Sequence, residues 1–139
     1  MMSAEEIYSK VKCLRGSKHI DMYITTNRII IAKIGSNLGW TLAFGVVGTY
    51  AAQRSADKKS AQLSQLTPES ILKADKHNYE ILNNEITQIE IKKPGAITTG
   101  KISIKTTYKT HKFVFKTKEE YNNNIDLFTR LFGSRLITI

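Results

Sequence analysis

The side chains that could carry catalysis or bind a metal in this chain are one cysteine, Cys13, and three histidines, His19, His77 and His111. A thiol beside an imidazole is typical of nucleophilic catalysis, in which a base activates the nucleophile and a third group orients the base. The spacing of these four residues indicates no such set, and no His/Cys pair has the short spacing of zinc ligands. We therefore predict a non-enzymatic protein with no cofactor and no metal, and we interpret Cys13 as a small core residue.

A second chemistry, the binding of anions, is indicated by a run of lysines in the C-terminal part of the chain. Between Ile91 and Lys118 there are eight lysines and no acidic residue. Two expected strands in this region, 101–106 and 111–116, place apolar side chains on one face and lysines on the other, because successive side chains of a strand point to opposite faces. The lysines on the non-core face are Lys101, Lys105, Lys112 and Lys116.

These lysines have three interpretations. A flat cationic surface would bind an anionic lipid surface, with about 1 kcal/mol from each basic residue. The same pattern is typical of the solvated face of an antiparallel sheet, where lysine also discourages edge-to-edge pairing. Nucleic acid is the third possible partner, but base recognition and stacking favour arginine and accessible aromatic rings. The hairpin has no arginine, and Phe113 and Phe115 fall on its core face, which argues against nucleic acid.

Length and composition set the class of protein. With 139 residues, the chain is expected to form a single domain, 1–139. Its formal net charge of +9 favours acidic partners. A lone cysteine cannot form an internal disulfide, which is typical of a reducing compartment. We therefore expect a cytoplasmic protein, either free or peripheral to the membrane, and we infer no small-molecule substrate.

Apolar residues that alternate with polar ones predict about seven strands and a terminal helix. Residues 4–10 are expected to form a short helix capped by Ser3. Thr117 and Glu120 form the capping-box pattern of a helix start, and Gly133 is placed to end that helix. The apolar tail 136–139 can add a further strand. The stripe of the C-terminal helix consists of Tyr121, Ile125, Phe128, Leu131 and Phe132. The seven strands are expected at 11–15, 20–25, 28–34, 79–82, 85–93, 101–106 and 111–116.

The segment between the third and fourth strands, about 35–77, is expected to be a helical insertion. Residues 34–53 carry no charge and have the length of a membrane span. Their glycines and polar side chains argue against a span, because glycine lowers helix propensity and polar groups are costly in lipid. We expect residues 38–66 to form one long helix or two, and Thr67-Pro68 to start another.

Small residues recur at every fourth position of this insertion, a spacing that lets two helix backbones approach closely. A bulkier apolar stripe lies beside them. Together they predict a helix–helix interface with a second copy of the chain, and therefore a homo-oligomer. The alternative is that the insertion folds back on the sheet of its own chain. A sheet with a C-terminal helix already has its core covered, so an additional apolar helix needs another surface to bury it. The predicted interface residues are Trp40, Phe44, Val47, Gly48, Ala52, Ala56 and Ser60.

Three segments resemble the pleckstrin-homology-like (PH-like) domains of prokaryotes and their GRAM relatives. The segment YITTNRIIIAK (23–33) is similar to that family's turn followed by an aliphatic strand. The segment EILNNEITQIEIKK (80–93) resembles its next strand pair. The segments GKISIKT and HKFVFKTKEEY resemble its final hairpin and capped helix. The resemblance covers residues 20–34 and 78–132 and leaves 35–77 outside.

The resemblance implies an α+β, mainly β fold: a PH-like, partly open barrel of about seven antiparallel strands capped by the C-terminal helix, with the inserted helical segment between strands three and four. Basic residues near the first turn do not match the family's head-group motif residue by residue, so lipid head-group binding is not carried over. The predicted function is a non-enzymatic binding or scaffold module that self-associates through its inserted helix. The alternatives are a peripheral membrane-binding module, which would use the lysines and the apolar helix, and a nucleic-acid-binding protein, which would use the basic hairpin.

Overall fold

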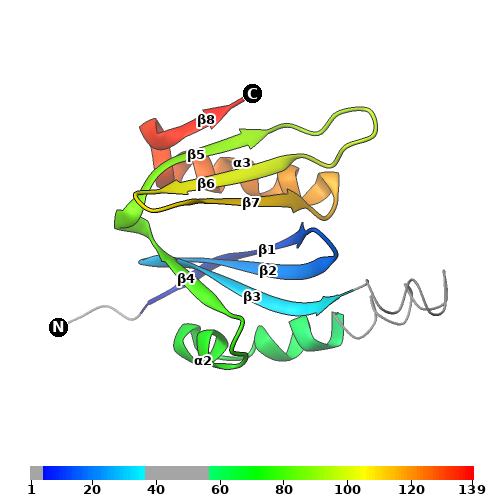
Figure 1. Ribbon diagram of the computed structural model, residues 1–139, viewed down its shortest axis with the longest axis vertical. Coiled ribbons are helices and arrows are strands. Elements are labelled where there is room, and N and C mark those ends of the chain that lie inside the picture. The colour runs from blue at the N-terminus through cyan, green and yellow to red at the C-terminus, as the bar shows by residue number, and fades with distance from the viewer. Residues whose placement is uncertain (1–4, 37–56) are drawn as a thin grey trace.

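The computed structural model describes residues 5–36 and 57–139, and in these residues the chain is mainly β (Figure 1). The described helices are the segment 57–63, α2 (Pro68–Lys73) and α3 (Lys118–Phe132), with short 3-10 turns η1 (Asn83–Glu85) and η2 (Gly133–Arg135). The strands are β1 (Ile7–Arg15), β2 (Lys18–Thr25), β3 (Arg28–Ser36), β4 (Tyr79–Leu82), β5 (Ile86–Lys92), β6 (Lys101–Thr106), β7 (Thr110–Phe115) and β8 (Leu136–Thr138).

The strands form one open sheet in the order β4-β3-β2-β1-β7-β6-β5-β8. Neighbours are antiparallel except β5 and β8, which are parallel. Only two residue pairs, Cys13 with Phe115 and Leu14 with Val114, join β1 to β7. The sheet therefore consists of two halves that meet along a short seam, and Figure 1 shows them as two layers with α3 behind the β5–β6–β7 half.

Inward-facing side chains of both halves and of α3 form the main core. Ile29 on β3, Ile89 on β5 and Ile104 on β6 are fully buried in it, and Phe128 of α3 closes it with no exposed surface. This arrangement follows from period-two alternation on the strands and a single apolar stripe on the helix. The predicted mainly β fold with a covering C-terminal helix is confirmed, with eight strands in the described residues rather than about seven.

A second, smaller core lies on the opposite face of β2 and β3. Tyr23, Ile30 and Ala32 pack there against Leu63 and Ile71, which come from the segment 57–63 and α2. The described part of the insertion therefore covers its own sheet, and β3 is buried on both faces. This explains the run of four apolar residues at 29–32, which is typical of a strand segment with no solvent-facing side.

Two predictions about the chain ends have different outcomes. The short helix predicted over 4–10 is wrong for residues 7–10, which belong to β1 and pair with β2 as far as Ile7 opposite Thr25. Pairing along the full length of β2 satisfies more backbone groups than a two-turn helix would, and it overrides local propensity. The strand expected from the apolar tail is confirmed as β8, which lies parallel to β5.

The C-terminal helix begins and ends where the sequence predicts. The Thr117 hydroxyl accepts a hydrogen bond from the Glu120 amide at 3.3 Å, and Gly133 ends the helix with a φ of +48°. The Glu120 carboxylate does not complete a capping box. It accepts from the backbone amide of Lys12 at 3.1 Å, so the first turn of α3 is tied to β1.

Candidate anion-binding surface

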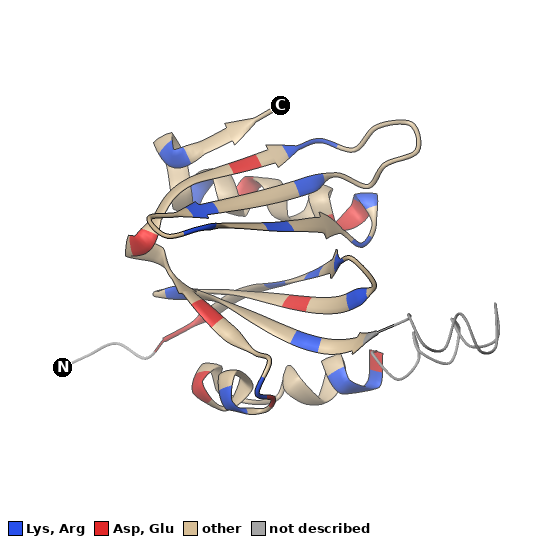
Figure 2. Cartoon of the chain, viewed as in Figure 1, with Lys and Arg blue, Asp and Glu red and all other residues tan. Residues whose placement is uncertain are grey.

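Lysines gather on the outer face of β5, β6 and β7. On β6, Ile102 and Ile104 are fully buried, so the residues between and beside them face outward. Figure 2 shows Lys and Arg positions along β6 and β7 and at the end of β5. We define the lysine face as the outward-facing lysines of these three strands: Lys92, Lys101, Lys105 and Lys112.

The lysine face carries an excess of positive charge. Lys92 lies directly opposite Lys101 on the neighbouring strand, and like charges in that position destabilise a sheet. Glu90 is the one acidic residue in these three strands. It lies on the same outer face, opposite Ser103, so the face carries four lysines against one carboxylate. Within residues 5–36 and 57–139, no ion pair includes a lysine of this face. The surface therefore has the charge for an anionic partner.

Lys116 does not belong to this surface, although its place in the alternation predicted so. Its Nζ lies 3.8 Å from Oδ1 of Asp57 at the start of the described helical segment, and its side chain is only 20% exposed. Burial lowers the pKa of Lys116, and the nearby Asp57 charge opposes that shift. Lys116 therefore helps to hold the segment 57–63 on the sheet.

Lys92 belongs to the lysine face, although it was not predicted there from the sequence. A register shift between Ile86 and Gln88 interrupts the alternation of β5, which made the face of each residue ambiguous in the sequence. Beyond that shift, Ile89 and Ile91 are fully buried, so Lys92 faces outward. The Ile-x-Ile-Lys pattern at the end of the strand was the signal that could have identified it.

A shallow depression of about 280 Å³ lies beside the lysine face, at the seam between β1 and β7. Lys101 and Lys112 border it, together with Arg15 at the end of β1 and Ser103 on β6. Three cationic side chains and a hydroxyl thus line one hollow, which concentrates positive charge at the edge of the face.

The candidate catalytic residues do not form a site. Cys13 is buried in the main core, and burial raises the pKa of its thiol, so the reactive thiolate is disfavoured. His19 lies buried in β2, and His77 lies after α2, where its ring contacts Asp75 at 2.9 Å. Among the residues that the structure describes, no group of three His, Cys, Asp or Glu side chains could hold a metal ion.

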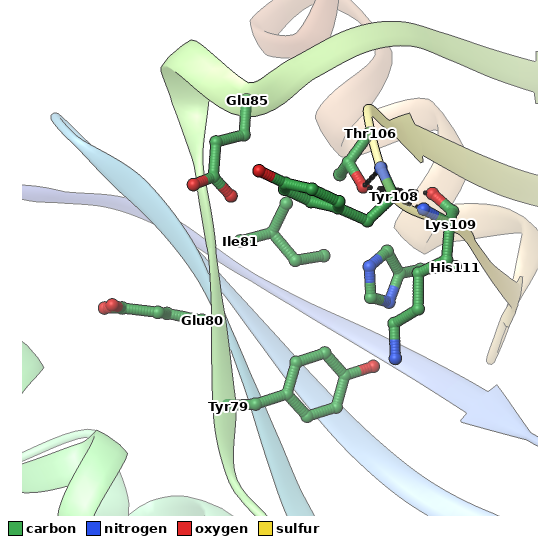
Figure 3. A pocket seen from close by; sticks show the side chains of 8 residues that line it. All are labelled: Tyr79, Glu80, Ile81, Glu85, Thr106, Tyr108, Lys109 and His111. Carbon is green, nitrogen blue, oxygen red and sulfur yellow. Dashed lines mark hydrogen bonds between the residues drawn. The ribbon is translucent and has the colours of Figure 1, made fainter.

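His111 lies at a second hollow of about 280 Å³, between β4 and the β6–β7 turn (Figure 3). Its ring stacks on Tyr79 with the centroids 5.6 Å apart, and Lys109 Nζ lies 5.8 Å from the centre of the Tyr79 ring. Burial and the charges of Lys109 and Arg15 lower the pKa of His111. Arg15 also donates to the Tyr79 hydroxyl at 2.8 Å.

The structure describes one of the seven predicted oligomer-interface residues. Ser60 is 1% exposed and is buried inside the chain, where its hydroxyl donates to Asp21 and accepts from Lys10 Nζ at 3.0 Å. Ser60 is therefore not available on the surface for the predicted interface with a second copy of the chain. Self-association through the remaining six stays a prediction, because they lie outside the described residues: Trp40, Phe44, Val47, Gly48, Ala52 and Ala56.

Asp21 is a buried acidic residue on β2, covered by the helical segment 57–63. It has no exposed surface, and one carboxylate oxygen accepts from Ser60 and, at 3.4 Å, from the Tyr23 hydroxyl. The other oxygen, Oδ1, is buried and has no hydrogen-bond partner among residues 5–36 and 57–139. Burial raises the pKa of Asp21, while Ser60, Lys10, Lys12 and Tyr23 oppose that shift. The contact between segment and sheet thus includes an incompletely satisfied carboxylate.

We expect Asp21→Asn to change how stability depends on pH. Because the pKa of Asp21 is higher in the folded chain than in the unfolded one, its contribution to stability is full below the unfolded value and falls as pH rises through the folded value. Urea unfolding across acidic to neutral pH should show wild type losing stability relative to Asp21→Asn as pH rises. Asp126→Asn, at an exposed site on α3, is the control. Parallel profiles for wild type and Asp21→Asn would contradict this expectation.

Comparison with known proteins assigns no family. No protein-family model matches the sequence, and a search of curated proteins finds no match. In the described part of the chain, no helix is both long enough and apolar enough to span a bilayer.

Proposed function

We propose that this chain is a non-enzymatic binding module that attaches to anionic membrane surfaces through its lysine face. The observation that carries the proposal is the excess positive charge on one outer sheet face, where Lys92, Lys101, Lys105 and Lys112 share the surface with a single acidic residue, Glu90. A flat cationic surface suits a lipid bilayer, because many head groups can meet it at once and each basic residue adds about 1 kcal/mol.

We further propose that the fold is of the PH-like kind. The first seven strands pair with one another only in antiparallel fashion, the sheet is open, and an amphipathic helix follows the last strand of the hairpin β6–β7. This element order supports the resemblance seen in the sequence. The parallel strand β8 and the insertion after β3 are additions to that order. Because one fold hosts lipid, peptide and assembly functions, the membrane proposal is based on the lysine face and not on the fold.

Vesicle binding tests the proposal. Purified protein is sedimented with vesicles of phosphatidylcholine alone, and with vesicles that also contain phosphatidylglycerol, at low and raised salt. We expect binding only to the anionic vesicles, and weaker binding at raised salt because the charges are screened. The triple variant Lys101→Gln, Lys105→Gln, Lys112→Gln should bind roughly a hundredfold more weakly, at about 1 kcal/mol per lysine.

The matched control removes the same charge elsewhere. Lys58, Lys76 and Lys118 are exposed lysines outside the lysine face, and changing all three to glutamine should weaken binding only slightly. Equal losses in the two triple variants would mean that net charge alone governs attachment. Absence of binding to anionic vesicles at low salt would exclude the function, and a gel shift with DNA or RNA under that condition would favour nucleic acid instead.

A further inference from the structure

The loop between β5 and β6 presents one large apolar side chain to solvent. Ile97 is 96% exposed, the highest value among the large hydrophobic residues that the structure describes. The loop, residues 93–100, has no charge between Lys93 and the start of β6 at Lys101. A single exposed isoleucine is ordinary on a protein surface, so its surroundings decide whether it has a role.

The loop is held in shape by its own hydrogen bonds. The Gly95 amide donates to the Thr98 carbonyl oxygen at 3.2 Å and to the Thr98 hydroxyl at 2.9 Å, which closes a turn with Ile97 inside it. These bonds constrain the backbone on both sides of Ile97, so binding through this residue would cost little backbone conformational entropy.

The base of the loop is attached to β7. The Phe115 amide donates to the Gly100 carbonyl oxygen at 3.0 Å, and the Thr99 hydroxyl donates to the Phe115 carbonyl oxygen. Gly100 has a φ of +99°, and a Cβ there would lie 3.0 Å from the Lys92 carbonyl oxygen. The close approach that only glycine allows thus fixes the loop against the end of the lysine face.

Three lysines lie where the loop leaves the sheet. Lys92 and Lys101 lie opposite each other as the last pair of β5 and β6, and Lys93 follows Lys92 at the loop's start. All three are exposed. This order matches a bilayer, in which head groups lie outside the acyl chains: the three lysines would meet the head groups, and the apolar tip of the loop would reach the acyl chains.

We infer that the loop 93–100 inserts Ile97 into the acyl region of an anionic bilayer while Lys92, Lys93 and Lys101 contact the head groups. The inference rests on the proposed function and adds to it a specific insertion element and an orientation: the lysine face lies on the head groups, tilted so that its β5–β6 end is the part nearest the acyl region. The β6–β7 turn with Tyr108 lies at the other end of β6 (Figure 1) and stays outside.

An environment-sensitive dye at the loop tip tests the insertion directly. Ile97→Cys can be labelled with nitrobenzoxadiazole (NBD) at one site, because the native Cys13 is only 1% exposed. Tyr108→Cys is the matched control, since Tyr108 is 84% exposed at the opposite end of the strand. With phosphatidylcholine–phosphatidylglycerol vesicles, we expect a several-fold rise in NBD emission with a blue shift at position 97 and no change at position 108.

Unlabelled variants measure the contribution of the side chain. Ile97→Ser should reduce the vesicle partition coefficient about tenfold, the lower end of what burial of one isoleucine contributes. Ile97→Leu should retain it, and Tyr108→Ser should bind like wild type. Both substituted side chains are largely exposed, so circular dichroism of the variants should match wild type.

The outcomes separate this inference from the function on which it rests. If the wild type binds anionic vesicles but the dye at position 97 does not respond and Ile97→Ser binds normally, attachment is purely electrostatic and the insertion is excluded. If the dye responds equally at positions 97 and 108, the proposed orientation is excluded. If the wild type does not bind anionic vesicles at all, both the function and the insertion are excluded.

Discussion

Replacing Arg28 with methionine is expected to lower the free energy of unfolding by about 3 kcal/mol, the lower end of the loss when one partner of a largely buried ion pair is removed. Arg28 begins β3, and its side chain is only 13% exposed. Its guanidinium contacts three carboxylates from different parts of the chain. These are Glu5 before β1, Glu69 in α2 and Glu80 in β4.

The geometry of these contacts explains the size of the expected loss. Arg28 Nε and one terminal nitrogen each lie 3.0 Å from an oxygen of Glu5, so that pair is bidentate. The same Glu5 carboxylate accepts from the Thr25 hydroxyl at 2.5 Å. The pKa of Arg28 is raised, first by its hydrogen bond to Glu5. Methionine would leave Glu5 and Glu80 close together without a cation.

Urea unfolding of three variants measures this effect. Arg28→Lys keeps the charge but cannot bond three carboxylates with one fork, so it should recover only part of the loss. Lys73→Met, which removes an exposed i,i+4 partner of Glu69, is the control for losing one positive charge nearby. A midpoint for Arg28→Met that equals the control would show that the cluster adds nothing to stability.

Replacing Phe128 with alanine is expected to lower the free energy of unfolding by about 3–5 kcal/mol, as for other fully buried phenylalanines. Phe128 has no exposed surface and stacks on Phe132 with the ring centroids 6.1 Å apart. It is the point at which α3 closes the main core. Its loss leaves a cavity between the helix and both halves of the sheet, and rigid strands cannot collapse to fill it.

The control for Phe128 comes from the other side of the same helix. Asn123 is exposed, and Asn123→Ala should leave stability unchanged or raise it slightly, because alanine has the highest helix propensity. Phe128→Leu retains most of the apolar volume and should cost much less than alanine. If Phe128→Ala unfolds at the urea midpoint of Asn123→Ala, α3 does not cover the core in solution.

The sequence predicted the elements of this fold well where the signal was local. Alternation of isoleucine with polar residues located β6 and most of β5, and Thr117 and Gly133 located the ends of α3. These signals need only near neighbours, because the period of a strand and the capping of a helix are set within a few residues. The face of Lys101, Lys105 and Lys112 followed directly from that period.

The errors arose where a distant segment decided the structure. Residues 7–10 show no strong alternation of apolar and polar side chains, and they form a strand because they pair with β2. Lys116 has the same place as Lys112 in the alternation of buried and exposed residues. Its ion pair with Asp57, however, places it outside the lysine face. Ser60 was predicted to lie in an oligomer interface, but it is buried within the chain, where it forms hydrogen bonds with Asp21 and Lys10. Each error concerns a contact between residues far apart in the chain.

Sequence patterns were sufficient to predict most of the strands, the C-terminal helix and the excess of lysine on one hairpin face, because periodicity and charge are properties of neighbouring residues. Only the tertiary structure decided that the insertion's described part covers β2 and β3, that Lys92 completes the lysine face, and that Ile97 projects from its end. Those features depend on which surfaces meet in the folded chain. Burial and exposure are set by that packing and not by the local pattern.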